Sequence, residues 1–137
     1  MSVKVTEEQA RLEAERWIEK RHVAASKLKG LEENVNDLVD YIKRGVVTIS
    51  EDGVVTQNLM SPIEDASGGI ALERLVFKTR LSVNEFKDAT KGIDAKTDPS
   101  GFALALASVL TSQSKSMIGK QEAYDFHVTQ TISVFFM

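Results

Sequence analysis

The sequence predicts an α+β protein in which a long N-terminal helix precedes a small domain of antiparallel strands covered by three short helices. Three observations support this prediction. An apolar heptad pattern runs through the first third of the 137 residues, and two short β-branched runs around a glycine-containing turn follow it. The rest of the chain holds one alternating strand and several helix-capping signals. We therefore divide the chain into a long amphipathic helix, residues 1–45, and a small α+β domain, residues 46–137.

The first helix is predicted from Thr6 to about Arg44. Apolar residues recur at alternating steps of four and three, and Arg21 is the only polar residue in the series. A period of 3.5 keeps one seam of a helix facing a partner helix, as in coiled coils. Thr6 and Gln9 have the spacing of a capping box. The positions of the seam are Ala10, Ala14, Trp17, Arg21, Ala24, Leu28, Leu31, Val35, Leu38 and Ile42.

Gly30 bears on whether this helix is continuous, because a glycine in a helix interior costs about 1 kcal/mol. The heptad register passes through Gly30 without a slip, which favours a continuous helix over a hairpin turn. The seam then faces a partner helix, in an oligomer or a complex, or it lies on the chain's own domain. In an oligomer or a complex, the expected contacts are the large seam residues Trp17, Leu28, Leu31, Val35, Leu38 and Ile42.

The next segment predicts strands. Two β-branched runs, 46–50 and 54–56, flank Gly53 and predict a β-hairpin, which Pro62 is expected to end. A glycine pair at 68–69 marks a second turn, and an alternating strand follows it. One face of that strand is apolar and is expected to be buried: Leu75, Phe77, Thr79 and Leu81. The other face is mostly basic and is expected to be exposed: Arg74, Val76, Lys78 and Arg80.

Capping signals predict the helices of the second domain. Ser82 and Glu85 have the spacing of a capping box, and the helix that they start is expected to end near Gly92. Asp98 followed by Pro99 predicts the start of the next helix. After a polar break, a last helix places four large residues on one side: Tyr124, Val128, Ile132 and Phe135.

Composition excludes several classes of protein and site. The chain has no cysteine, so neither a disulfide framework nor a thiolate site is possible. The net charge is −3 and no basic stripe is present, which argues against nucleic acid as a partner. The N-terminus lacks the apolar core of a signal peptide, and the longest apolar run is too short to span a membrane. We therefore expect a cytoplasmic protein.

No pattern of residues indicates catalysis. The two histidines, His22 and His127, are far apart in sequence, so we expect structural roles for them and no metal site. The acidic residues near 64–65 and 94–98 have the neighbours of turn and cap residues. The basic strip Arg74, Lys78 and Arg80 is interpreted as a solvated face rather than a phosphate clamp. We expect no enzymatic activity and no cofactor.

From residue 46 onward, the order of elements and several phrases resemble the tail assembly chaperones of long-tailed phages, of the Mu-like type. The C-terminal motifs contribute most to this resemblance, because a Thr-x-Gln break, an acidic-aromatic pair and a closing Phe-Phe follow one another at a spacing similar to that of the family. Ser112 stands where that family usually has a glycine, and the long N-terminal helix is not a usual part of these proteins. The matching stretches are 75–80, 82–86, 107–113, 117–120, 123–126 and 134–136.

The resemblance implies a non-enzymatic role in the cytoplasm of a bacterial host. Such chaperones bind the long helical tape-measure protein, help to recruit tail-tube subunits, and are absent from the mature virion. A homo-oligomer is expected along such a partner. Possible contacts of the distal domain are Arg74, Lys78, Arg80, Tyr124 and Phe126. The alternative is a structural or adaptor phage protein that homo-oligomerises through its N-terminal helix and stays in the finished particle.

Overall fold

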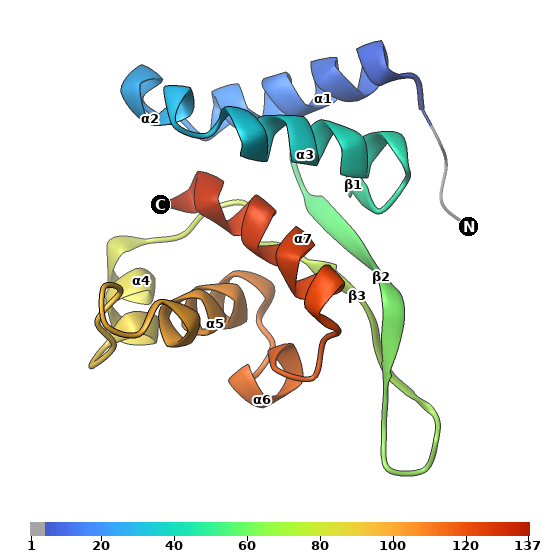
Figure 1. Ribbon diagram of the computed structural model, residues 1–137, viewed down its shortest axis with the longest axis vertical. Coiled ribbons are helices and arrows are strands. Elements are labelled where there is room, and N and C mark those ends of the chain that lie inside the picture. Colours follow the sequence, from blue (N-terminus) through green and yellow to red (C-terminus); the bar gives the residue numbers. More distant parts are fainter. Residues whose placement is uncertain (1–4) are drawn as a thin grey trace.

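The computed structural model describes residues 5–137, and within them the fold is α+β, with seven α-helices and a three-stranded antiparallel sheet (Figure 1). One layer contains three N-terminal helices: α1 (Glu7–Lys20), α2 (Ala25–Lys29) and α3 (Glu32–Lys43). The sheet follows, in the order β1 (Val47–Ile49), β2 (Val55–Glu64) and β3 (Ile70–Val76). The remaining helices are α4 (Val83–Thr90), α5 (Pro99–Thr111), α6 (Lys115–Ile118) and α7 (Ala123–Ser133), which a 3₁₀ turn (Val134–Phe136) extends.

The prediction of one long N-terminal helix is wrong. α1 has 14 residues and ends at Lys20, Arg21 is its C-cap, and His22 then takes the left-handed conformation, with φ 54°. A second break lies at Gly30, where the hairpin alternative had placed a turn, and α3 returns alongside α1. A hydrogen bond of 3.3 Å from Arg11 to Asn36 joins the two helices. Folding back lets both halves of the apolar seam bury their side chains within one chain.

Arg21 caps the end of α1 and contacts the distal part of the chain. Its guanidinium donates a hydrogen bond to the backbone carbonyl of Thr79 and lies 4.0 Å from the ring centroid of Phe136. Burial among these groups lowers the pKa of Arg21 from its ordinary value. The polar exception in the heptad pattern therefore marks a contact with the distal part of the chain.

The sheet confirms the predicted hairpin, but the alternating strand only in part. β3 ends at Val76, and Thr79, which was expected on the buried face, is exposed because the chain has left the sheet there. β1 and β2 are antiparallel around a turn in which Gly53 has φ 85°, and in β3 Leu75 is buried while Val76 is 51% exposed. Pro62, however, does not end the strand region, because β2 continues to Glu64. Its register against β3 shifts after Asn58, and this irregular segment accommodates the proline. The β2–β3 hairpin extends away from the helices (Figure 1).

The predicted caps of the second domain are confirmed, whereas at α1 Thr6 is the N-cap but accepts only the amide of Gln9, one of the two hydrogen bonds of a capping box. Ser82 and Glu85 form both hydrogen bonds of the capping box at the start of α4, which ends two residues before Gly92. Asp98 accepts a hydrogen bond from the amide of Gly101 and caps α5. At the other end of α5, Ser112 takes a left-handed conformation with φ 57°, which glycine adopts at less cost. Each of these caps depends only on residues close in sequence.

One hydrophobic core joins the N-terminal helices to the rest of the chain. α7 lies between the layer α1–α3 and the helices α4 and α5 (Figure 1), and it packs against both α3 and α5. Trp17 of α1 contacts Phe135 and Phe136 at centroid distances of 5.7 and 5.8 Å. The core is thus continuous across residue 45, and a separate role for residues 1–45 stays a prediction.

Candidate partner-binding site

The large seam residues occupy two different environments. Trp17, Leu38 and Ile42 are buried in the core, and their side chains are not available to a partner in this conformation. Leu31 is half-buried against the same core. Leu28 and Val35 are also half-buried, but they line an open groove on the N-terminal layer. Only part of the predicted seam is therefore accessible.

We call this groove the elbow groove, because it lies where α1, α2 and α3 bend around one another. Its volume is about 600 Å³. The lining comes from the end of α1, the following loop, α2 and the first turn of α3. Its residues are Glu15, Ile18, Glu19, His22, Val23, Leu28 and Val35.

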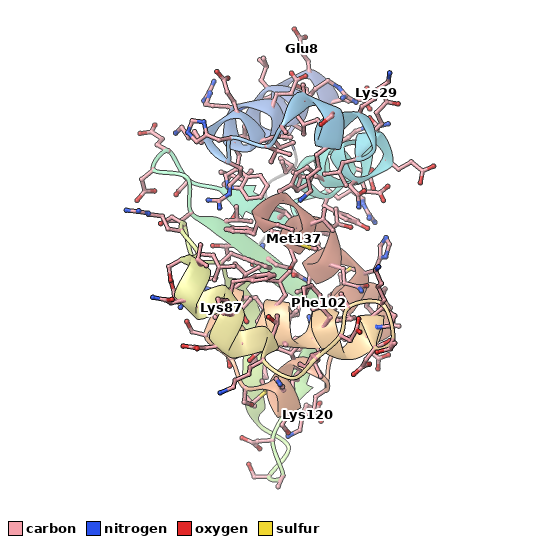
Figure 2. The ribbon with its side chains drawn as sticks, turned by 90° about the vertical axis from the view of Figure 1, so that its left-hand side faces the viewer. Glu8, Lys29, Lys87, Phe102, Lys120 and Met137 are labelled. Atoms are coloured by element: carbon pink, nitrogen blue, oxygen red, sulfur yellow. The ribbon has the colours of Figure 1, made fainter. Side chains whose placement is uncertain are left out.

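α2 forms one wall of the elbow groove and is weakly anchored. It has five residues, none of them buried, and no side-chain hydrogen bond caps its start. Its contacts with the rest of the chain include Leu28, which packs against the core, and Lys27, which donates a hydrogen bond to the backbone carbonyl of Met137. Figure 2 shows Met137 below the N-terminal helices. Few buried contacts make a segment easy to displace locally, so α2 can adjust to a bound partner.

The rim of the elbow groove carries negative charge. Glu15 and Glu19 are exposed one turn apart on α1, and neither forms an ion pair with another residue of the range 5–137. The cations Arg16 and Lys20 point away from the groove lining: they line one hollow near Glu51 on the β1–β2 turn and a second one that they share with Glu19 and His22. The groove lining itself contains no lysine or arginine. An apolar floor with an acidic rim suits a partner that presents apolar and basic side chains together.

The three basic residues of the distal domain do not act as one strip. Lys78 forms an ion pair with Glu85, 2.6 Å apart, and Arg74 pairs with the neighbouring Glu73 at 3.3 Å. The Lys78 ammonium and the Ser82 amide lower the pKa of Glu85 to about 2. Arg80 is exposed. Two of the three cations are thus already paired with carboxylates.

The two predicted aromatic contacts lie in different environments. Phe126 lines a second apolar hollow, of about 370 Å³, between α5, α6 and α7, together with Leu104 and Ile118. Tyr124 is 48% exposed, and its hydroxyl is hydrogen-bonded to that of Ser61. The second hollow lies toward the end of the molecule opposite α2, as the positions of Lys29 and Lys120 in Figure 2 indicate.

Between these aromatic residues lies Asp125, which the sequence did not single out as a structural group. It is fully buried, and its carboxylate accepts hydrogen bonds from the amides of Met60 and Ser61 at 2.9 and 3.0 Å. These amides belong to the irregular segment of β2. The buried Gln57 completes the junction, donating to the carbonyl of Asp125 and accepting from Thr129. Asp125 therefore fixes α7 on the sheet.

Several of the other titratable residues that the sequence raised have structural partners. Asp65 accepts hydrogen bonds within its own turn, from Ser67 and Gly69, and Asp94 accepts one from Lys96. His127 lies 3.8 Å from the carboxylate of Asp37. Within residues 5–137, no three histidine or acidic side chains come together in a way that would hold a metal ion. Over the same range, no helix is both long and apolar enough to cross a membrane.

Comparisons with protein-family models, curated proteins and solved structures find no match for this chain. The site therefore has to be interpreted from its own geometry. Leu28 and Val35 were predicted from the heptad pattern, whereas Glu15, Ile18, Glu19 and Val23 were not. The available signal was Arg21 followed by His22, since a polar break in the seam precedes a residue type that is enriched in the left-handed conformation.

Proposed function

We propose that this chain is a non-enzymatic tail assembly chaperone of a phage or prophage, which binds the tape-measure protein and helps to recruit tail-tube subunits. The resemblance of residues 46–137 to that family supports the class of protein. The elbow groove supports the mode of binding, because a concave apolar surface between helices suits the apolar face of another helix. The observation that carries the proposal is the half-exposed pair Leu28 and Val35 on the floor of this groove.

The groove replaces the continuous seam as the expected contact. With Trp17, Leu38 and Ile42 in the core, a coiled coil along the whole N-terminal segment would require α1–α3 to unfold. A partner helix in the elbow groove requires no such rearrangement. Several copies of the chain, each weakly bound at successive sites of a long helical partner, would together protect it through avidity.

The test is an affinity purification of the tagged chain from its own host during phage or prophage induction, with mass spectrometry of the bound proteins. We expect the tape-measure protein to co-purify, and we expect the tagged chain to be absent from finished particles. Leu28→Glu places a charge on the floor of the groove and should abolish co-purification. Val83→Glu is the matched control, because Val83 is 74% exposed on α4, outside the groove, and makes the same exchange of an apolar residue for a charge.

Two results would contradict the proposal. Recovery of the chain without the tape-measure protein would exclude the chaperone role. Its presence in mature particles would instead favour the structural adaptor. Circular dichroism of both variants is needed beside these measurements, because a loss of binding counts only if the variant is folded.

A further inference from the structure

We propose that the elbow groove selects a basic amphipathic helix, one whose apolar stripe is flanked by lysine or arginine. This inference rests on the proposed function as far as the partner is a helix of the tape-measure protein, and it adds the chemistry by which that helix is chosen. Its elements are the apolar floor, the acidic rim and the adjustable wall formed by α2.

The floor specifies an apolar stripe. Ile18, Val23, Leu28 and Val35 come from four consecutive segments of the chain and converge on one groove. A helix offers a matching stripe when its apolar residues recur at i, i+3, i+4 and i+7. A volume of about 600 Å³ is within the usual range of ligand-binding pockets.

The rim specifies the sign of the flanking charge. Glu15 and Glu19 lie at i and i+4 on α1, so their carboxylates form a row parallel to the axis of α1 and beside Ile18. A helix aligned with α1 presents its own side chains at the same spacing, and basic residues there would meet both carboxylates. An acidic helix would place like charges opposite this row, which disfavours binding.

The same row argues against a second copy of this chain as the occupant. A two-fold contact through the groove would be isologous, so that each surface meets its own equivalent. Where the two-fold axis passes beside this row, Glu15 and Glu19 of the two protomers come close together and repel each other. A different, basic helix avoids this repulsion and is the more complementary ligand.

The test uses two synthetic helical peptides of about 18 residues, or five turns, with an identical leucine stripe and either lysine or glutamate beside it. Fluorescence anisotropy of the labelled peptides measures their binding to the full-length protein at about 50 mM salt, where screening is weak. We expect the lysine peptide to bind at least about tenfold more tightly than the glutamate peptide. This preference should shrink at about 0.5 M salt.

Charge reversal locates the effect. In Glu15→Lys/Glu19→Lys, both residues are exposed, so the variant is expected to fold and to prefer the glutamate peptide. Glu64→Lys/Glu73→Lys makes the same change in net charge on the exposed surface of the β2–β3 hairpin and should keep the wild-type preference. Leu28→Glu should weaken the binding of both peptides, because it changes the floor.

Three outcomes would overturn the inference. They are equal binding of the two peptides to the wild-type protein, the same loss in both charge-reversal variants, and no binding of either peptide. These outcomes are separate from a failure of the proposed function. If the tape-measure protein co-purifies equally with wild type and Glu15→Lys/Glu19→Lys, the chaperone role stands and the selection for basic helices is wrong.

Discussion

The two ends of α7 are held in place by different chemistry. At its N-terminal end, buried polar groups join the helix to β2: Asp125 accepts from two strand amides, and Gln57 bridges to Thr129. At its C-terminal end, the contact with α1 is aromatic, with Trp17 packed against Phe135 and Phe136. Buried aromatic side chains stabilise a helix contact in several relative orientations of the two elements. Buried hydrogen bonds are satisfied only at one position of the helix on the strand. The polar contacts at the N-terminal end therefore determine the position of α7 on the sheet. The aromatic contacts at its C-terminal end pack the N-terminal layer, α1–α3, against it.

Trp17→Ala should have the largest effect, because it removes the aromatic contact and leaves a cavity. Truncation of a buried tryptophan costs about 3–5 kcal/mol of the free energy of unfolding. Trp17→Phe should cost less, because part of the ring contact with Phe135 remains. Trp17 is the only tryptophan, so both variants lack tryptophan fluorescence. Their urea unfolding is therefore followed by circular dichroism. A cost below about 1 kcal/mol for Trp17→Ala would show that α1 contributes little to the core.

Asp125→Ala tests the polar end and should cost about 2–4 kcal/mol, because the amides of Met60 and Ser61 lose their acceptors. Asp125→Asn retains one acceptor oxygen and should cost less. Amide hydrogen exchange gives a second, local measurement, in which the two amides should exchange faster in Asp125→Ala. Equal stability of the alanine variant and the wild type would contradict the role assigned to this carboxylate.

Gln57 and Thr129 test whether the buried hydrogen bonds between α7 and β2 are coupled to one another. Either Gln57→Leu or Thr129→Val breaks a buried hydrogen bond of 2.7 Å. Gln57→Leu leaves the Thr129 hydroxyl with the Asp125 carbonyl and Gln121 as partners, whereas Thr129→Val leaves the Gln57 side-chain oxygen without its donor. Each single change should cost about 1–3 kcal/mol. The double variant should cost less than the sum of the two, by about 1–2 kcal/mol, because the bond between the two side chains is lost only once. Strict additivity in urea unfolding would show that the pair is not coupled.

A region was predicted correctly where its contacts join residues close in sequence, and missed where they join residues far apart. The caps at Ser82 and Asp98 were predicted correctly, because their hydrogen bonds span three residues. The end of α1 was missed, because Arg21, the residue at that end, makes its side-chain hydrogen bond to Thr79, 58 residues away. A heptad pattern indicates that an apolar seam exists, but it is equally consistent with one long helix and with two helices packed back to back.

The candidate site was predictable to the same limited extent. Leu28 and Val35 belong to the seam and could be named from periodicity alone. Glu15, Ile18 and Val23 join them only because the chain bends at residues 21–24, so no local pattern identifies them as neighbours. The buried role of Asp125 was hidden for a similar reason, since its partners lie more than 60 residues earlier.

The smallest expected effect comes from Glu85, an exposed counterpart of Asp125. This carboxylate also accepts a backbone amide, from Ser82, and it pairs with Lys78. Its pKa falls from 4.5 to about 2 in the folded protein, so the folded state favours the ionised form. The resulting stability is present above pH 4.5 and is lost as the pH falls toward 2. Because solvent screens an exposed pair, we expect only a small change in stability over this range.

Lys78→Met tests this exposed pair directly. It removes the main cause of the shift, so NMR titration should show the pKa of Glu85 rising toward 4.5. The rise should be incomplete, because the Ser82 amide still donates to the carboxylate. Lys87→Met, on the same helix, is the control and should leave the titration unchanged. If Lys78→Met instead destabilised the fold as strongly as Asp125→Ala, burial would not be what distinguishes the two carboxylates, and the contrast between a fixed junction and a solvated surface would fail.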